Sequence, residues 1–223
     1  MEKTIRVTGK GKLSVKPDTI RLIMTLEGLA YEYEQAVKES ADMTEKMKDM
    51  YEKLGFERSE LKTLYFNVNP EYESYQAKDK CWKRRFEGYK YIHRTKIEFP
   101  ADNSKLGKVF FALGHSVIQP EFSIEYTVKN PEKSKNELLA NAVKDSMEKA
   151  NVLADAAGVV LGDIVTIDYS WAEIDFVSRP MNTMILEECC MRAQVEADGS
   201  YDIDIEPDDI DVSDSVTVVW SIK

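Results

Sequence analysis

The segment NPEKSKNELLANAVKDSMEKANVLADAAG, residues 130–158, predicts one long helix with both ends marked in the sequence. Asn130 can cap its amino end, Pro131 suits the first helical position, and Gly158 can stop it. Apolar residues recur between these ends at helical spacing: Leu138, Leu139, Ala142, Val143, Met147, Ala150, Leu153, Ala154 and Ala157. A helix with one apolar stripe must bury it against another element. The rest of the chain has to supply that apolar surface.

Segments on both sides of this helix alternate between apolar and polar residues, with the period of two typical of half-buried strands. The alternating segments are residues 4–15, 19–28, 61–72, 85–99, 121–128, 159–171 and 212–223. Two further helices are predicted at residues 33–54 and 104–113, with Gly55 and Gly114 as their stops and Asn103 as the cap of the second. The polar residues 73–84 are predicted to form a long hairpin loop.

This order predicts an α+β fold of two pseudo-repeated β-α-β-β units. LGFERSELKTLYFNV and AGVVLGDIVTIDYSW each place a glycine, a short connection and a strand after a long helix. We expect an antiparallel-rich sheet packed by two long helices and one short helix around a shared apolar core. Residues 1–223 are therefore predicted to form a single domain.

An insertion at about residues 176–212 interrupts what would otherwise be a hairpin between the last two strands. Residues 181–191 are predicted to form one or two amphipathic helical turns, and the acidic part after them a mobile loop. From Ala193 to Ile222 the sequence has no Lys or Arg. It has nine acidic residues there: Glu196, Asp198, Asp202, Asp204, Glu206, Asp208, Asp209, Asp211 and Asp214.

The formal charge of −10 argues against nucleic acid as the main partner, because binding phosphates needs a clustered basic face. The local exception is KDKCWKRR, residues 78–85, which we interpret as a solvated hairpin tip rather than an anion site. No run approaches the roughly 18 apolar residues of a membrane span. The first residues, MEKTIRVTGKGK, also lack an apolar signal core, so we predict a cytoplasmic protein with no membrane span.

The opening stretch VTGKGKLSVKPD raises the question of a phosphate-binding loop. Such a loop needs four residues between its glycines and a helix after them, whereas Gly9 and Gly11 are two apart and lie in a predicted strand. Glycines within a strand indicate a bulge or the close approach of another segment. Pro17 and Asp18 then predict a turn into the next strand.

Several of these landmarks resemble the SIMPL family, also called the DUF541 domain, along essentially the whole chain. They are the opening IRVTGKGKLSVKPDTIRLIMTLEG, the GYKY of residues 88–91, ANAVKDSMEKANVLADAAGVVLGDI in the long helix, and the valine-rich final strand. The family has no settled catalytic residues to transfer. The resemblance implies a stress-related or scaffolding role, commonly with self-association.

Histidine and cysteine residues offer no recognisable catalytic or metal-binding pattern. His93 and His115 have no neighbouring ligand at metal-site spacing, so both are interpreted as structural. Cys81, Cys189 and Cys190 match no zinc motif or disulfide framework, and we interpret them as ordinary thiols. No catalytic residue and no cofactor is predicted.

The acidic loop is the one candidate metal site. In DGSYDIDIE, Asp198, Asp202, Asp204 and Glu206 could gather oxygen ligands around calcium, although the order of an EF-hand loop is missing. A solvated acidic insertion is the competing interpretation, and we favour it.

The sequence thus favours a non-enzymatic protein that acts through self-association and the binding of protein partners, with a homo-oligomer as the expected state. The alternative is a protein that binds a small ligand in the groove between helices and sheet, or a metal ion such as calcium in the acidic loop.

Overall fold

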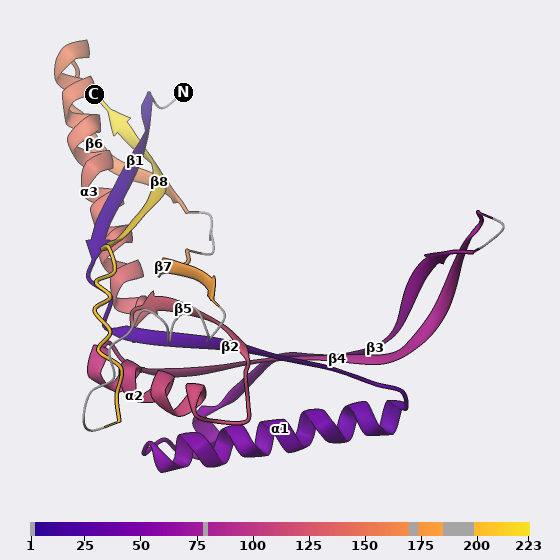
Figure 1. Ribbon diagram of the computed structural model, residues 1–223. Helices are drawn as coiled ribbons and strands as arrows, with labels where there is room; N and C mark the ends of the chain where they lie inside the picture. The colour runs from indigo at the N-terminus through magenta and orange to yellow at the C-terminus, as the bar shows by residue number, and fades with distance from the viewer. Residues whose placement is uncertain (1–2, 78–79, 170–173, 185–198) are drawn as a thin grey trace. The chain divides into compact units, whose positions relative to one another are not determined.

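The computed structural model describes residues 3–77, 80–169, 174–184 and 199–223 (Figure 1). The chain divides into two compact units. Unit 1 contains residues 1–18, 127–178 and 207–223, and unit 2 contains residues 19–126 and 179–206. The α+β class is confirmed, with two antiparallel sheets in place of the one expected. The buried apolar residues also gather in separate clusters that each belong to one unit.

Unit 1 is a three-stranded sheet with one long helix on it. The strands β1 (Thr4–Val15), β8 (Ile210–Ile222) and β6 (Leu161–Asp168) lie in the order β1-β8-β6, and both pairings are antiparallel. The helix α3 (Pro131–Ala157) packs on β1 and β8 (Figure 1). Because β6 pairs with β8, the residues between them do interrupt a hairpin, as predicted.

The predicted ends of α3 are confirmed. The side chain of Asn130 accepts a hydrogen bond from the backbone N–H of Lys133 at 3.4 Å, and Pro131 begins the helix. Gly158 ends it with a φ of 66°, in the left-handed region where glycine carries no Cβ penalty.

Glycines in β1 allow α3 to lie directly on the strand. A Cβ on Gly9 would come within 2.0 Å of the carbonyl oxygen of Ala142, and a Cβ on Gly11 within 2.1 Å of that of Leu138. The buried face of α3 is correspondingly narrow and recurs every four residues: Leu138, Ala142, Ser146, Ala150 and Ala154. The prediction that these glycines mark a close approach is confirmed.

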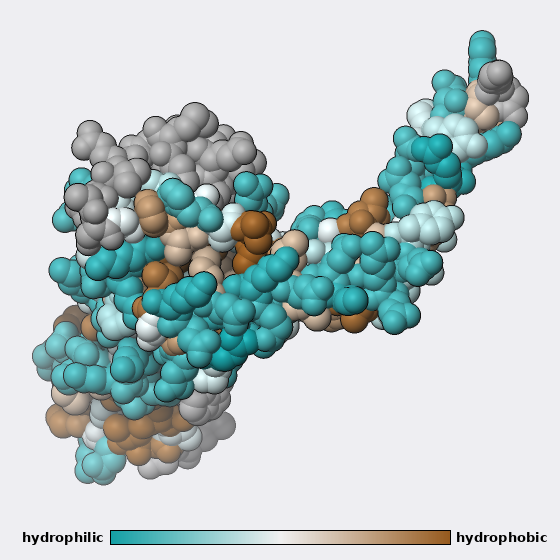
Figure 2. Space-filling view, turned by 60° about the horizontal axis from the view of Figure 1, so that its bottom comes forward, coloured by the Kyte–Doolittle hydropathy of each residue, from teal (hydrophilic) through white to brown (hydrophobic). Residues whose placement is uncertain are grey.

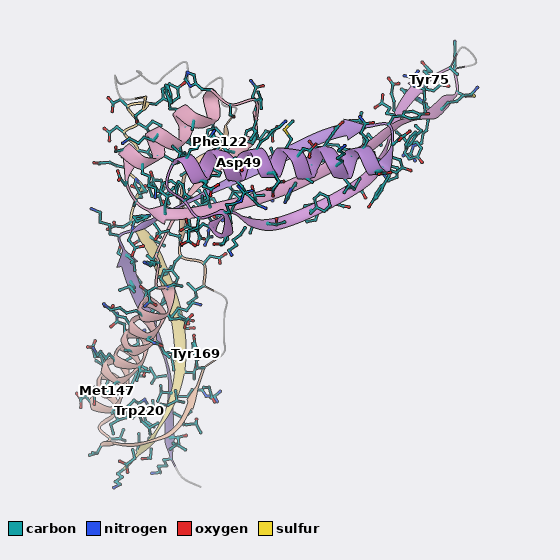
Figure 3. All side chains as sticks on the ribbon, turned by 90° about the horizontal axis from the view of Figure 1, so that it is seen from below. Asp49, Tyr75, Phe122, Met147, Tyr169 and Trp220 are labelled. Atoms are coloured by element: carbon teal, nitrogen blue, oxygen red, sulfur yellow. The ribbon has the colours of Figure 1, made fainter. Side chains whose placement is uncertain are left out.

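Unit 2 is built on a five-stranded sheet in the order β3-β4-β2-β5-β7. Its elements are β2 (Thr19–Ala30), α1 (Tyr33–Lys53), a 3₁₀ turn (Arg58–Glu60), β3 (Lys62–Gln76), β4 (Trp82–Pro100), α2 (Asn103–Gly114), β5 (Glu121–Thr127) and β7 (Val177–Met184). Figure 1 shows α1 running along β2 and β4. The core holds aromatic pairs such as Phe110 and Phe122, whose ring centroids lie 4.7 Å apart (Phe122 is labelled in Figure 3).

The pseudo-repeat is visible in the topology of the two units. In unit 2, β2-α1-β3-β4 places the last strand between the other two, and in unit 1 the series β1, α3, β6, β8 does the same. In each case a long helix packs on the resulting three strands.

The long hairpin loop predicted at residues 73–84 is wrong. β3 continues to Gln76 and β4 begins at Trp82, with these two residues paired. The pairing of β2 with β4 ends at Ala30 and Tyr89, so the hairpin extends beyond the third strand as a two-stranded arm, residues 72–86 (Figure 1). An arm that is exposed on both faces has no apolar side, which is why its sequence resembles a loop.

The described parts of the insertion are more ordered than predicted. β7 extends to Met184, so residues 181–184 are strand rather than helix, and residues 185–198 lie outside the described part. Residues 200–206, here called the strap, run in extended form across α2. Tyr201, Ile203 and Ile205 join the apolar core of unit 2. The acidic residues between them face solvent, so the strap is a packed segment.

The cap of α2 differs from the predicted one in a way that involves the strap. Asp102, not Asn103, accepts from the backbone N–H groups of Ser104 and Lys105, at 2.9 and 3.3 Å. The side chain of Asn103 instead donates to the carbonyl oxygen of Ile205 in the strap at 3.2 Å. An amide can serve either purpose, and sequence alone gives no sign of the distant partner.

Candidate functional site

Unit 2 contains a groove between α1 and the strands β3 and β4, with a buried imidazole in its wall. Its volume is about 460 Å³. The residues that line it are Val37, Ser40, Ala41, Thr44, Glu45, Lys48, Thr63, Phe66 and His93. The sequence predicted a groove between helices and sheet as the place for a small ligand, and this groove lies between a helix and a sheet.

His93 contacts hydroxyl groups from two different elements. Its Nδ1 lies 3.0 Å from Oγ1 of Thr44 and 3.4 Å from Oγ of Ser40, both on α1. Its Nε2 lies 2.9 Å from Oγ1 of Thr63 on β3. Ser40 and Thr44 are one helical turn apart, which places both hydroxyls on the face of α1 that covers β4.

The hydrogen bonds define the tautomer of this histidine. The hydroxyl of Thr44 donates to the carbonyl oxygen of Ser40 at 2.8 Å, so its oxygen is left to accept from Nδ1–H of His93. Nε2 then carries a lone pair, which accepts the hydroxyl hydrogen of Thr63. A neutral imidazole protonated on Nδ1 therefore satisfies the whole cluster.

The surroundings of His93 favour this neutral form. Burial, and after it the positive charge of Lys48, lowers the pKa of His93 below its ordinary value of 6.5. The side chain is 8% exposed. A proton added to Nε2 would remove the acceptor that Thr63 uses, so the cluster resists protonation.

The lining of this groove combines the hydrogen-bonded imidazole with apolar side chains. In a hydrolase triad a carboxylate orients the histidine, whereas the partners of His93 are hydroxyls. Val37, Ala41 and Phe66 provide apolar wall, and the ring of Phe66 stands 5.3 Å from the imidazole. An ion pair of 2.8 Å between Lys48 and Glu45 lies on the rim. Such a lining suits a small, mostly apolar molecule with few polar atoms.

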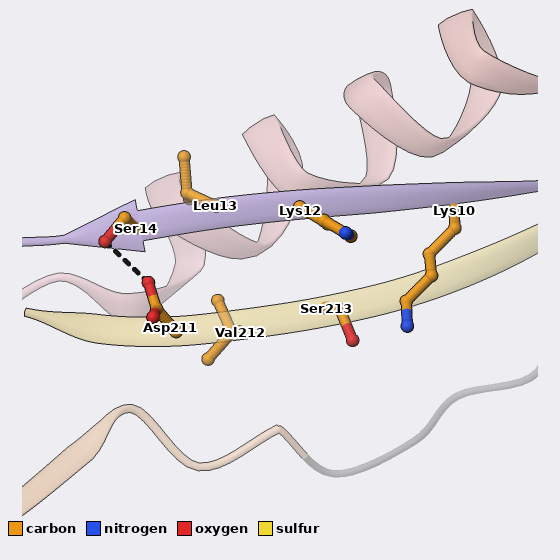
Figure 4. A pocket seen from close by; sticks show the side chains of 7 residues that line it. All are labelled: Lys10, Lys12, Leu13, Ser14, Asp211, Val212 and Ser213. Atoms are coloured by element: carbon orange, nitrogen blue, oxygen red, sulfur yellow. Dashed lines mark hydrogen bonds between the residues drawn. The ribbon is translucent and has the colours of Figure 1, made fainter.

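A second hollow, of about 400 Å³, lies on the polar face of the sheet in unit 1 (Figure 4). Lys10, Lys12 and Ser14 line it from β1, and Asp211 and Ser213 from β8. The hydroxyl of Ser14 donates to Asp211 at 2.6 Å. The lysines of the opening stretch thus lie on an exposed face beside a carboxylate.

Three of the four predicted calcium ligands lie in the described part of the chain. Asp202, Asp204 and Glu206 are exposed at alternate positions of the strap, and Asp198 lies outside the described residues. The described part of the chain holds no group of three or more acidic, His or Cys side chains that could share a metal ion.

The remaining candidates lie apart from the groove. His115 follows α2, where its Nδ1 contacts the carbonyl oxygen of Phe111 at 2.8 Å and its ring stacks on that of Phe111. Cys81 is an exposed thiol at the tip of the arm, and Cys189 and Cys190 lie outside the described residues. Lys80, Lys83, Arg84 and Arg85 are exposed at the same tip.

The cluster around His93 could not be predicted from its neighbours in the sequence, because its hydrogen-bond partners lie far away along the chain. A usable signal was present in α1, where Ser40 and Thr44 put two hydroxyls four residues apart next to the predicted apolar stripe. Polar residues at such positions are satisfied by a partner from the facing element.

Known proteins resemble this chain along nearly its whole length. The SIMPL family model, described as a protein of unknown function (DUF541), matches residues 5–220. Two relatives are each named a 26 kDa periplasmic immunogenic protein, one from Brucella melitensis biotype 1 and one from Brucella abortus strain S19. Each is 26% identical over 219 residues, which cover 98% of this chain and 84% of the relative.

The helices in the described residues include none that is both long and apolar enough to cross a membrane. The family match extends over both units, from β1 to β8, and so includes the glycines of β1, the capped helix α3 and the final strand. On this basis the chain belongs to the SIMPL family.

Proposed function

We propose that this SIMPL protein acts through its surfaces, by self-association and by binding protein partners in a scaffolding role, rather than by catalysis. The observation that carries the proposal is the edge strand β6. It stands at the end of the sheet order in unit 1, with one side unpaired among the described residues. Ile164, Val165 and Ile167 expose 45%, 45% and 51% of their surface there. An apolar, unpaired edge is a template for pairing with another chain.

Other apolar side chains in unit 1 are exposed as well. Met147, Val152 and Leu153 are exposed on α3, and Val160 is exposed just before β6. Figure 2 shows brown, apolar side chains at the surface beside the teal polar ones, and Met147 is labelled on α3 in Figure 3. Burial of such residues in an interface releases water from apolar surface.

Size-exclusion chromatography with light scattering tests this proposal. We expect an oligomer at micromolar concentration, and we expect Val165→Lys to shift it toward the 25.5 kDa monomer, because the added charge blocks the edge. Val117→Lys is the matched control, since it places the same change at an exposed valine of unit 2, away from the strands of unit 1. A wild-type protein that is strictly monomeric would overturn the proposal.

A second candidate function is the binding of a small ligand in the groove beside His93. The apolar wall and the satisfied neutral imidazole favour it. Native mass spectrometry of freshly purified protein should then show a retained small mass. Ala41→Phe, which fills the groove from α1, should remove that mass, whereas Lys46→Phe on the same helix outside the groove should keep it. A bare mass for the wild type would contradict ligand binding.

Calcium binding by the acidic segment and location in the cytoplasm stay predictions. If the segment binds calcium, millimolar calcium raises the melting temperature, and an unchanged melting curve ends the idea. The two Brucella relatives are named periplasmic, which is at odds with a cytoplasmic protein. Cell fractionation decides the compartment, and recovery of the protein in a periplasmic fraction would overturn our prediction.

A further inference from the structure

The outer part of the hairpin arm combines exposed aromatic and cationic side chains. Trp82 is 72% exposed, and Tyr72 and Tyr75 are 41% and 42% exposed. Lys80, Lys83 and Arg84 are exposed on the same stretch, as is Arg85, which forms an ion pair of 2.6 Å with Glu73 of the arm. Figure 2 shows this end of the arm mostly teal and white, and Tyr75 is labelled near the tip in Figure 3. Aromatic residues and arginine together are the composition of interface hot spots.

The arm is built to hold these side chains in place. Its strands pair from Tyr72 and Phe86 to Gln76 and Trp82. The turn at the tip is closed by backbone hydrogen bonds from Ala77 to Cys81 at 2.9 Å and from Lys80 to Ala77 at 2.8 Å. The guanidinium of Arg84 lies 4.8 Å from the ring centre of Tyr72, a distance typical of a cation–π contact. A preorganised surface loses less entropy on binding.

The strap offers a surface of opposite charge in the same unit. Tyr201 is buried and Ile203 and Ile205 are half-buried against the core, whereas Asp202, Asp204 and Glu206, at the alternate positions, are exposed. The strap is fixed to the unit by the backbone hydrogen bond from Tyr201 to Gly107, at 3.3 Å. The side chains of Asn103 and Tyr126 also donate to the carbonyl oxygen of Ile205.

These two surfaces lie at opposite ends of unit 2. The strap crosses α2, and both Figure 1 and Figure 3 show α2 at one end of the unit and the tip of the arm at the other. The arm of one molecule therefore cannot reach its own strap. A second copy of the chain carries both the acidic target and the basic arm, so the charges match in a head-to-tail arrangement.

We propose that the arm of one copy docks on the strap of a second copy, with its cations paired to Asp202, Asp204 and Glu206 and with Trp82 as the apolar anchor. This contact rests on the proposed self-association and assigns it a second surface, separate from β6. Because the cationic and acidic faces lie at different ends of unit 2, two copies can make the contact reciprocally, or many copies can repeat it head to tail.

Charge exchange tests the contact. The arm variant carries Lys80→Glu, Lys83→Glu and Arg84→Glu, and the strap variant carries Asp202→Lys, Asp204→Lys and Glu206→Lys. Each variant alone should weaken association by at least about tenfold, measured by light scattering or analytical ultracentrifugation, because like charges then meet. An equimolar mixture of the two variants restores one correct arm–strap pair, so it should associate where each alone does not.

The remaining outcomes separate this contact from the wider proposal. Wild-type association through the arm should fall when salt is raised, since exposed charges are screened. If neither charge-reversal variant changes the oligomer but Val165→Lys dissociates it, the arm–strap contact is overturned and association through β6 is supported. A monomeric wild type overturns both. The contact is also overturned if the wild-type protein binds vesicles with anionic lipid while neither charge-reversal variant changes its self-association. Thermal melting of each variant verifies that it is folded.

Discussion

At the scale of single residues, the glycines of β1 allow the close packing of α3 in unit 1. Gly9→Ala places a methyl group where the carbonyl oxygen of Ala142 lies, 2.0 Å from the new Cβ. That oxygen belongs to the backbone of α3, so the helix itself must move. We expect the free energy of unfolding to fall by about 1–3 kcal/mol or more. Urea denaturation measures it, with Lys12→Ala on the exposed side of β1 as the control, and an unchanged midpoint would contradict the role given to Gly9.

The buried imidazole links stability to pH. Because the pKa of His93 is lower in the folded protein than its ordinary 6.5, the unfolded chain binds the proton more readily. Stability contributed by the neutral ring is therefore complete above pH 6.5 and is lost as the pH falls toward the lower folded pKa.

Replacing His93 with a side chain that does not titrate separates its contribution to the pH dependence of stability from that of other groups. His93→Asn keeps a donor for Thr44 but carries no group that titrates in this range, so we expect a flatter dependence of the melting temperature on pH between about 5 and 7. His115→Asn controls for the loss of an imidazole elsewhere. Equal slopes for His93→Asn and the wild type would refute the account.

At the scale of elements, sequence patterns predicted those parts that have one apolar face. The helix α3 was located from its cap, its stripe and its stop, and β1 and β2 from their alternation. The arm was missed because neither of its faces is apolar. The strap escapes prediction for another reason: YDIDIE alternates with a period of two, but its density of acidic residues is also typical of a solvated loop. The cluster around His93 joins residues 53 positions apart, which no local pattern contains.

The strap depends on a glycine in α2. A Cβ on Gly107 would lie 2.2 Å from the carbonyl oxygen of Tyr201. In a helix, Gly→Ala normally stabilises by about 1 kcal/mol. Here we expect Gly107→Ala to displace the strap, so that the amides of residues 200–206 exchange hydrogen faster by mass spectrometry. Lys108→Ala in the same helix should leave their protection unchanged, and unchanged protection in Gly107→Ala would contradict the close contact.

At the scale of the whole molecule, separate apolar clusters predict separable unfolding. Leu138→Ala in unit 1 and Leu22→Ala in unit 2 each remove a fully buried side chain, at a cost of about 2–5 kcal/mol. By differential scanning calorimetry we expect the two variants to shift different transitions, with a calorimetric enthalpy above the van't Hoff value for the wild type. A single transition lowered equally by both variants would favour the single domain that the sequence predicted.

The pairing of β1 with β8 has a consequence for biosynthesis. Thr8 and Thr217 face each other across this pair and are 209 residues apart. A ribosome therefore releases the first strand of unit 1 long before the strand that lies next to it, and the whole of unit 2 is synthesised in between. During translation β1 has no partner strand until β8 is synthesised. Val7, which is buried in the folded protein, is therefore accessible to chaperones during that time.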